Sequence, residues 1–310
     1  MGSLVPYLIV AESLSPKRIP KIMPYVELSR PQNIPASMIF SAGGTLSVVD
    51  EVYRNDVFST PTGGGECLTS MVVVAGIAVF STVINGYFDA LRGVDDGSKN
   101  PIVRGEISYS EVRGYAGKLA LMLAVLVGTD VNVPPELKWV YGGGIAVTYV
   151  YTEYLKPVFL LKNVSVALLT ALAPISGGIS KLGSLAEALQ SEHLVGLATA
   201  SFFGIFHREV LMDILDMEGD KNAGVETFPV LYGVEKSLLF TAGLLSVVLG
   251  SGMMFSKTQW LSDAGTIAMM YNVMGLYKRS KGGADVREEC KKAIESSILT
   301  FVLVVSSYCF

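Results

Sequence analysis

Charged residues are scarce in this chain of 310 residues, where Asp, Glu, Lys and Arg together make up 17%. A soluble domain of this size carries about a quarter. Because 50% of the residues are also hydrophobic, the composition argues against an ordinary soluble domain. Cysteine is equally rare, and Cys67, Cys290 and Cys309 have no spacing typical of a metal or redox motif. Neither a disulfide framework nor a cysteine-bound metal is therefore expected.

A secretory signal is not expected either. Residues 1–11 are moderately apolar but lack a basic start and a cleavage site. The polar segment that follows carries Lys17, Arg18 and Lys21, which suit a membrane surface. We therefore divide the chain into an amphipathic lead-in of residues 1–32 and a membrane domain of residues 33–310.

The hydrophobic residues gather in blocks close to the roughly 20 residues that a helix needs to cross a bilayer. These blocks predict membrane spans near residues 34–50, 70–91, 114–129, 138–155, 163–180, 194–212, 237–255, 260–277 and 293–310. The predicted fold class is all-α, an integral multi-pass membrane protein with about nine transmembrane helices.

The distribution of Lys and Arg tests this arrangement, because loops on the inner side of a membrane are enriched in them. With nine spans, all 24 Lys and Arg residues lie on the side of the N-terminus except Arg54, Lys138, Lys181 and Lys257. A wrong number of spans would scramble this asymmetry. The charges therefore favour nine helices with the N-terminus inside, but they do not indicate an organelle.

Three acids near the end of the sixth predicted span share one helix face. Asp213, Asp216 and Asp220 stand at i, i+3 and i+7, and like charges at this spacing repel unless a cation lies among them. Carboxylate oxygens are the ligands that Mg²⁺ prefers. The alternative is a solvated acidic helix end, but the apolar run 194–206 places the cluster where a membrane helix reaches the surface. Acids in that position are functional candidates.

A second polar cluster closes the second predicted span. Asn85 and Asp89 lie one turn apart, and Asp95 and Asp96 follow beyond Gly93, where we expect the helix to end. The predicted topology puts this cluster on the same side as the first. Two such clusters facing each other would hold divalent ions and a diphosphate between them.

With these motifs the chain resembles the UbiA-type intramembrane prenyltransferases, in which nine helices carry two aspartate-rich motifs, closing the second and the sixth helix. The stretch Asp213-x-x-Asp216-x-x-x-Asp220 is similar to the second family motif. Thr227-Phe228-Pro229-Val230 is similar to its continuation. Two shorter stretches also match family positions, Arg30-Pro31-x-Asn33 and Tyr154-x-Lys156.

The first motif departs from the common family pattern Asn-Asp-x-x-Asp-x-x-x-Asp. Gly86 and Gly93 stand where that pattern has its second and last acids. A glycine followed by a displaced aspartate, Asp95, is similar to the menaquinone and phylloquinone branch. The second motif is most similar to enzymes of archaeal-type lipids and plastid quinones. The acceptor therefore stays open, and Gly86 puts the number of metal ligands in question.

The resemblance implies an Mg²⁺-dependent enzyme that ionises a prenyl diphosphate donor and transfers its isoprenoid chain to an aromatic or other lipid-precursor acceptor. Membrane lipid surrounds it, and no nucleic-acid partner is expected. The implied metal ligands are Asn85, Asp89, Asp95, Asp213, Asp216 and Asp220. The implied catalytic residues are Asp89, Asp213, Asp216, Lys156 and Arg208. The implied substrate contacts are Asn33, Asn85, Arg104, Tyr154, Lys156 and Lys221.

Two other functions remain open from the sequence. A terpene cyclase on the same scaffold would act on a prenyl diphosphate without an acceptor, and product analysis with and without an aromatic acceptor would separate it from a transferase. A transporter would use the acids to bind a coupling ion. Transport sites usually lie near the middle of the membrane, whereas these clusters lie at helix ends. The enzyme interpretations are therefore favoured.

Overall fold

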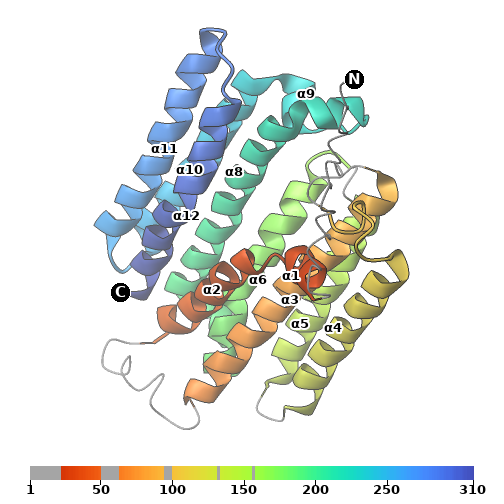
Figure 1. Cartoon of the computed structure of the whole chain (residues 1–310). Helices are drawn as coiled ribbons and strands as arrows, with labels where there is room; N and C mark the ends of the chain where they lie inside the picture. Colours follow the sequence, from red (N-terminus) through yellow and green to blue (C-terminus); the bar gives the residue numbers. More distant parts are fainter. Residues whose placement is uncertain (1–21, 50–62, 94–99, 131–132, 156–157) are drawn as a thin grey trace, which may run out of the picture.

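A computed structural model describes residues 22–49, 63–93, 100–130, 133–155 and 158–310. Within these ranges every regular element is a helix (Figure 1). The long helices are α2 (Ile34–Ser47), α3 (Gly63–Arg92), α4 (Tyr109–Thr129), α5 (Pro135–Val150), α6 (Leu161–Leu182), α8 (Glu192–Asn222), α10 (Val234–Phe255), α11 (Gln259–Lys281) and α12 (Arg287–Cys309). The all-α prediction is confirmed.

Each predicted span overlaps one long helix, but the count of nine membrane crossings is not confirmed. By length and composition, six helices of the described chain are able to cross a membrane: α3, α4, α6, α8, α10 and α12. Helices α2 and α5 have only 14 and 16 residues. Helix α11 has 23 residues, and its last turn carries Lys278, Arg279 and Lys281.

Short elements cap the bundle or join its helices. They are α1 (Met23–Ser29), η1 (Pro31–Asn33), the π-turn η3 (Tyr151–Leu155), α7 (Leu185–Gln190) and α9 (Phe228–Tyr232). The predicted helix end at Gly93 is confirmed, because α3 stops at Arg92 and Gly93 has a φ of 65°. The basic residues of the lead-in, Lys17, Arg18 and Lys21, lie outside the described residues, so the division at residue 32 stays a prediction.

Two large hydrophobic cores and a smaller one fill the bundle. Figure 1 shows the helix groups that build the two large cores side by side. Helices α3, α4 and α5 build most of one large core, and α8, α10, α11 and α12 build most of the other. Helices α2 and α6 cross between them at very short distance. A Cβ added to Gly44 would lie 1.8 Å from the Pro174 carbonyl oxygen, and one added to Gly177 would lie 1.9 Å from that of Ser41. These two glycines therefore permit the crossing that places α6 against α8.

Hydroxyl groups join the helices in the centre of the bundle. The Ser70 hydroxyl of α3 lies 2.9 Å from that of Ser41 in α2, and it accepts a hydrogen bond of 2.9 Å from Tyr141 of α5. The Ser176 hydroxyl of α6 is 3.4 Å from the same atom. Because buried polar groups cost free energy unless they are paired, this network specifies how the four helices pack.

Candidate active site

The second acidic motif occupies the C-terminal turns of α8, and its three acids have different environments. Asp213 is fully buried at 0% exposure, Asp216 is exposed, and Asp220 is half-buried. The shared helix face therefore runs from the interior of the bundle to its surface. The innermost acid needs a partner, because an isolated buried carboxylate is strongly disfavoured.

Helix α6 supplies that partner from its first turn. Lys162 donates from Nζ to Asp213 Oδ1 at 2.7 Å, and Asn163 donates from Nδ2 to Asp213 Oδ2 at 2.8 Å. Asn163 is buried, and the Lys162 side chain is 23% exposed. Both carboxylate oxygens are thus held by groups that sequence reasoning did not assign to the site. The signal that could have identified them is the Lys-Asn pair that begins the apolar helix α6.

Charges from three helices meet around Tyr151 in the π-turn η3. The buried Tyr151 hydroxyl interacts electrostatically with Glu209 of α8, Lys162 of α6 and Asp89 of α3. Lys162 also interacts with Glu209 and Asp220 in addition to Asp213. The structure therefore brings residues of both acidic motifs to the same polar end of the bundle. Glu209 and Tyr151 were not among the predicted site residues.

The π-turn itself is held by the last turn of α3. Arg92 donates from Nη1 to the Thr152 carbonyl oxygen at 2.9 Å and from Nη2 to that of Glu153. Single π-turns occur frequently at functional sites, because they re-aim the side chains of a helix. Here the turn directs Tyr151 inward, while Tyr154 is 61% exposed.

The first motif lies on α3, where Asp89 is buried at 7% exposure. The presence of glycine at position 86 has a structural explanation. A Cβ at this position would lie 2.6 Å from Cδ1 of Leu28 in α1. Leu28 thus occupies space beside the helix where the common family pattern has an acid. Asp95, Asp96 and Lys156 lie outside the described residues, so their predicted roles stay predictions.

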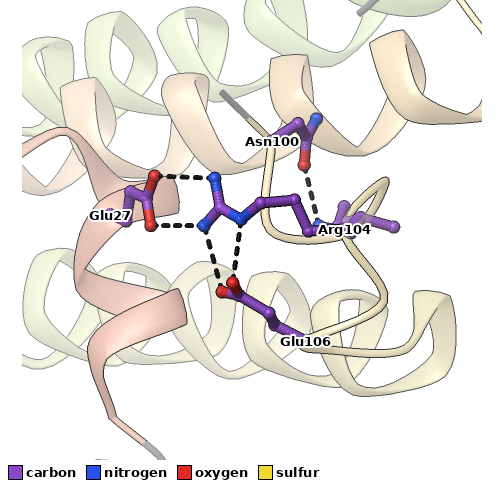
Figure 2. Close-up of polar contacts among 5 residues, drawn as sticks. Glu27, Asn100, Arg104 and Glu106 are labelled. Atoms are coloured by element: carbon purple, nitrogen blue, oxygen red, sulfur yellow. Dashed lines mark hydrogen bonds and ion pairs between the residues drawn. The ribbon is translucent and has the colours of Figure 1, made fainter. Parts of the chain in front are cut away.

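Arg104 lies between two carboxylates, as Figure 2 shows. Nη1 and Nη2 bind the two carboxylate oxygens of Glu27 at 3.0 and 2.6 Å. Nε and Nη2 bind those of Glu106 at 2.8 and 3.0 Å. The hydrogen bonds that Arg104 donates to Glu106 and then to Glu27 raise the pKa of its guanidinium further above the usual range. Direct substrate binding by Arg104 stays a prediction.

The remaining predicted contacts differ in exposure. Asn33 and Lys221 are exposed, like Tyr154. Arg208 lies in α8, and its Nε is buried without a hydrogen-bond partner among the described residues. That unpaired donor suits an anionic ligand such as a phosphate oxygen.

The residues at the polar end of the bundle carry groups that a hard divalent cation prefers as ligands. They offer carboxylate and amide oxygens, and Oδ2 of Asp220 is buried without a hydrogen-bond partner within the described chain. Among the described residues, no group of three or more His, Cys, Asp or Glu side chains gathers closely enough to hold a metal ion. The predicted set of metal ligands includes Asp95, which lies outside the described residues. The ligand set therefore stays a prediction.

Comparison with known proteins identifies the family. A sequence profile described as the UbiA prenyltransferase family matches residues 57–295. A relative named digeranylgeranylglyceryl phosphate synthase, from Pyrococcus abyssi, is 30% identical over 233 residues, which cover 74% of this chain and 76% of the relative. A second synthase of that name, from Pyrococcus horikoshii, is 31% identical over 227 residues, covering 72% and 75%.

Solved structures share the fold. The apo structure of a UbiA homologue from Aeropyrum pernix has a TM-score of 0.68 at 13% identity, covering 90% of this chain and 97% of that one. A UbiA homologue from Archaeoglobus fulgidus, bound to DMAPP and Mg²⁺, has a TM-score of 0.62 at 19% identity, covering 91% and 99%. The chain belongs to the UbiA prenyltransferase family. The predicted resemblance is confirmed, and the protein is an integral membrane prenyltransferase.

Proposed function

We propose that this UbiA prenyltransferase transfers a geranylgeranyl chain from its diphosphate to a prenylated glyceryl phosphate. The relatives named digeranylgeranylglyceryl phosphate synthase support this acceptor class, because this chain covers about three quarters of their length. One structural observation carries the proposal: at the polar end of the helices, Lys162 and Asn163 of α6 hold Asp213 of α8 by hydrogen bonds of 2.7 and 2.8 Å. Tyr151, within electrostatic reach of Lys162, also interacts with Asp89 of the first motif. A diphosphate at this end can keep its isoprenoid tail within the membrane.

Asn85, Asp89, Asp213, Asp216 and Asp220, together with Asp95, would hold Mg²⁺. When bound, the metal neutralises the negative charge that develops on the diphosphate as the allylic C–O bond breaks. The electron pair of that bond leaves with the diphosphate. A hydroxyl oxygen of the acceptor then forms the new C–O bond, and its proton passes to an oxygen of the released diphosphate.

Residues of this chain contribute to the same step. Arg208 has a buried Nε–H group without a hydrogen-bond partner among the described residues. This group would donate a hydrogen bond to the departing diphosphate. Lys162 fixes Asp213 from the facing helix, so the acid cannot turn away. The apolar helices exclude water, which would otherwise capture the allylic cation.

A series of aromatic rings leads away from the site along α8 and α10. Phe228 stacks on Phe240 with ring centroids 4.6 Å apart, Phe240 meets Phe206 at 5.6 Å, and Phe206 meets Phe202 at 6.0 Å. Phe202 lies 11 positions before Asp213, or about 17 Å along the helix. Its ring lines an apolar cavity of about 230 Å³ between α6, α7 and α8. The proposed tail of the isoprenoid lies along these rings.

The test is a product assay with the purified protein in lipid nanodiscs. Radiolabelled geranylgeranyl diphosphate is offered with geranylgeranylglyceryl phosphate, with an aromatic quinone precursor, or with no acceptor. We expect an Mg²⁺-dependent ether product with the glyceryl phosphate alone. A product with the aromatic acceptor instead would contradict the acceptor class, and a hydrocarbon product without acceptor would support the cyclase alternative.

A further inference from the structure

The turn of α3 that carries Asn85 and Asp89 is contacted from outside by two separate segments. One is α1, whose Leu28 side chain is buried at 5% exposure and lies against Gly86. The other is the loop of residues 100–107. Asn100 of this loop is 4% exposed and donates from Nδ2 to the Gly86 carbonyl oxygen at 2.8 Å. Both contacts meet at Gly86, which has no side chain.

The same two segments are bound to each other through Arg104 (Figure 2). Its guanidinium joins Glu27 of α1 to Glu106 of the loop through four hydrogen bonds. Glu27 precedes Leu28 directly, so the ion pair and the packing contact act on the same turn of α1. The end of α1 is also tied to α3, since Thr82 donates to the Ser29 carbonyl oxygen at 3.0 Å.

A glycine within this turn makes such support necessary. Gly destabilises a helix interior by about 1 kcal/mol relative to Ala, because it loses more backbone freedom on folding. Asn85 and Asp89 flank that glycine, and a displacement of about 1 Å at a reacting centre can reduce a rate about 100-fold. Contacts that restrict the turn therefore bear directly on the geometry of the site.

We propose that α1 and the loop of residues 100–107 form a clamp that positions the Asn85–Asp89 turn, with Arg104 and Asn100 as positioning residues. The clamp acts through Leu28 packing at Gly86 and through the hydrogen bond from Asn100, and Arg104 locks the two segments together. The inference rests on the proposed function, because turnover is one measure of the position of the turn. It differs from the sequence prediction that Arg104 contacts the substrate.

Exchanging the charges of Glu27 and Arg104 in the full-length enzyme distinguishes a positioning role of Arg104 from direct binding of the substrate. The single changes Glu27→Gln and Arg104→Gln should each lower kcat at least about tenfold, with KM for the prenyl diphosphate almost unchanged. The double change Glu27→Arg with Arg104→Glu restores the ion pair in reverse and should recover most of kcat. Glu289→Gln, which breaks an exposed ion pair with Arg279 elsewhere, is the matched control and should keep full activity.

If Arg104 binds the diphosphate directly, the exchanged double variant stays as inactive as Arg104→Gln, and KM for the donor rises in both. That result would overturn the clamp. A second variant tests the packing contact: Leu28→Ala removes the contact at Gly86 and should lower kcat, with KM for the donor almost unchanged. Wild-type kcat in folded Leu28→Ala protein would also contradict the proposal.

Hydrogen exchange of the α3 backbone reports the clamp independently of turnover. Amides of residues 85–92 should exchange faster in both single variants and return to the wild-type rate in the exchanged double variant. Unchanged exchange in all variants would overturn the clamp even if the enzyme proved inactive with every acceptor. A wild-type enzyme without transfer activity would instead contradict the proposed function, so the two failures are distinguishable.

Discussion

Asp213 of α8 is fully buried, and its Oδ1 accepts a hydrogen bond of 2.7 Å from Nζ of Lys162 in α6. Breaking one partner of a buried ion pair leaves an uncompensated charge. Lys162→Met and Asp213→Leu should therefore each lower the free energy of unfolding by about 3 kcal/mol or more. The double variant should regain stability, because it buries no unpaired charge.

In these Lys162 and Asp213 variants, stability should recover in the double variant but activity should not. Neither single variant nor the double variant should transfer the isoprenoid chain, because the double variant lacks Asp213. Chemical unfolding and a product assay on the same four proteins provide the check. An active double variant would mean that Asp213 and Lys162 only hold α6 against α8.

Removal of the divalent metal should stop turnover. The site offers carboxylate and amide oxygens, so Mg²⁺ or Mn²⁺ is required and neither Lys162 nor Arg208 can replace it. We expect no product in excess EDTA and full recovery when Mg²⁺ is restored. Turnover at the normal rate in chelator, with metal-free substrate, would contradict the proposed ionisation of the diphosphate.

The loop of residues 100–107 should loosen at acid pH. The hydrogen bonds from Arg104 lower the pKa of Glu106. A lowered folded-state pKa means that this contact stabilises the loop above the ordinary Glu pKa of about 4.3 and is lost as pH falls through the lowered value. Hydrogen exchange in residues 102–106, corrected for its intrinsic rate, should rise in that acid range. Glu106→Gln should exchange faster at neutral pH and show a smaller acid-dependent rise, because only the contact of Arg104 with Glu27 remains.

Much of this architecture could be predicted from the sequence. Blocks of apolar residues located the long helices, because burial in a bilayer demands hydrophobic length. The i, i+3, i+7 spacing put Asp213, Asp216 and Asp220 on one helix face. The number of crossings is less certain from the sequence, because α2 and α5 are short and α11 ends in a basic turn.

The partners of the site residues could not be predicted, because they depend on how distant segments pack. Lys162 and Asn163 lie 50 or more positions from Asp213. Leu28 accounts for Gly86 only when α1 is placed against α3. Arg104 was predicted from the sequence to contact the substrate, but the fold brings Glu27 to it from 77 positions away.

The central claim is that the acids of α8 act on a diphosphate, and Asp216→Ala tests it most directly. Asp216 is exposed, so its loss should change the free energy of unfolding by no more than about 0.5 kcal/mol. Glu218→Ala is the matched control, because this exposed acid on the same helix pairs with Arg287. The measurement is the rate of isoprenoid transfer by both folded variants. We predict that Asp216→Ala has no detectable transfer and Glu218→Ala has the wild-type rate; a wild-type rate in folded Asp216→Ala would contradict the account.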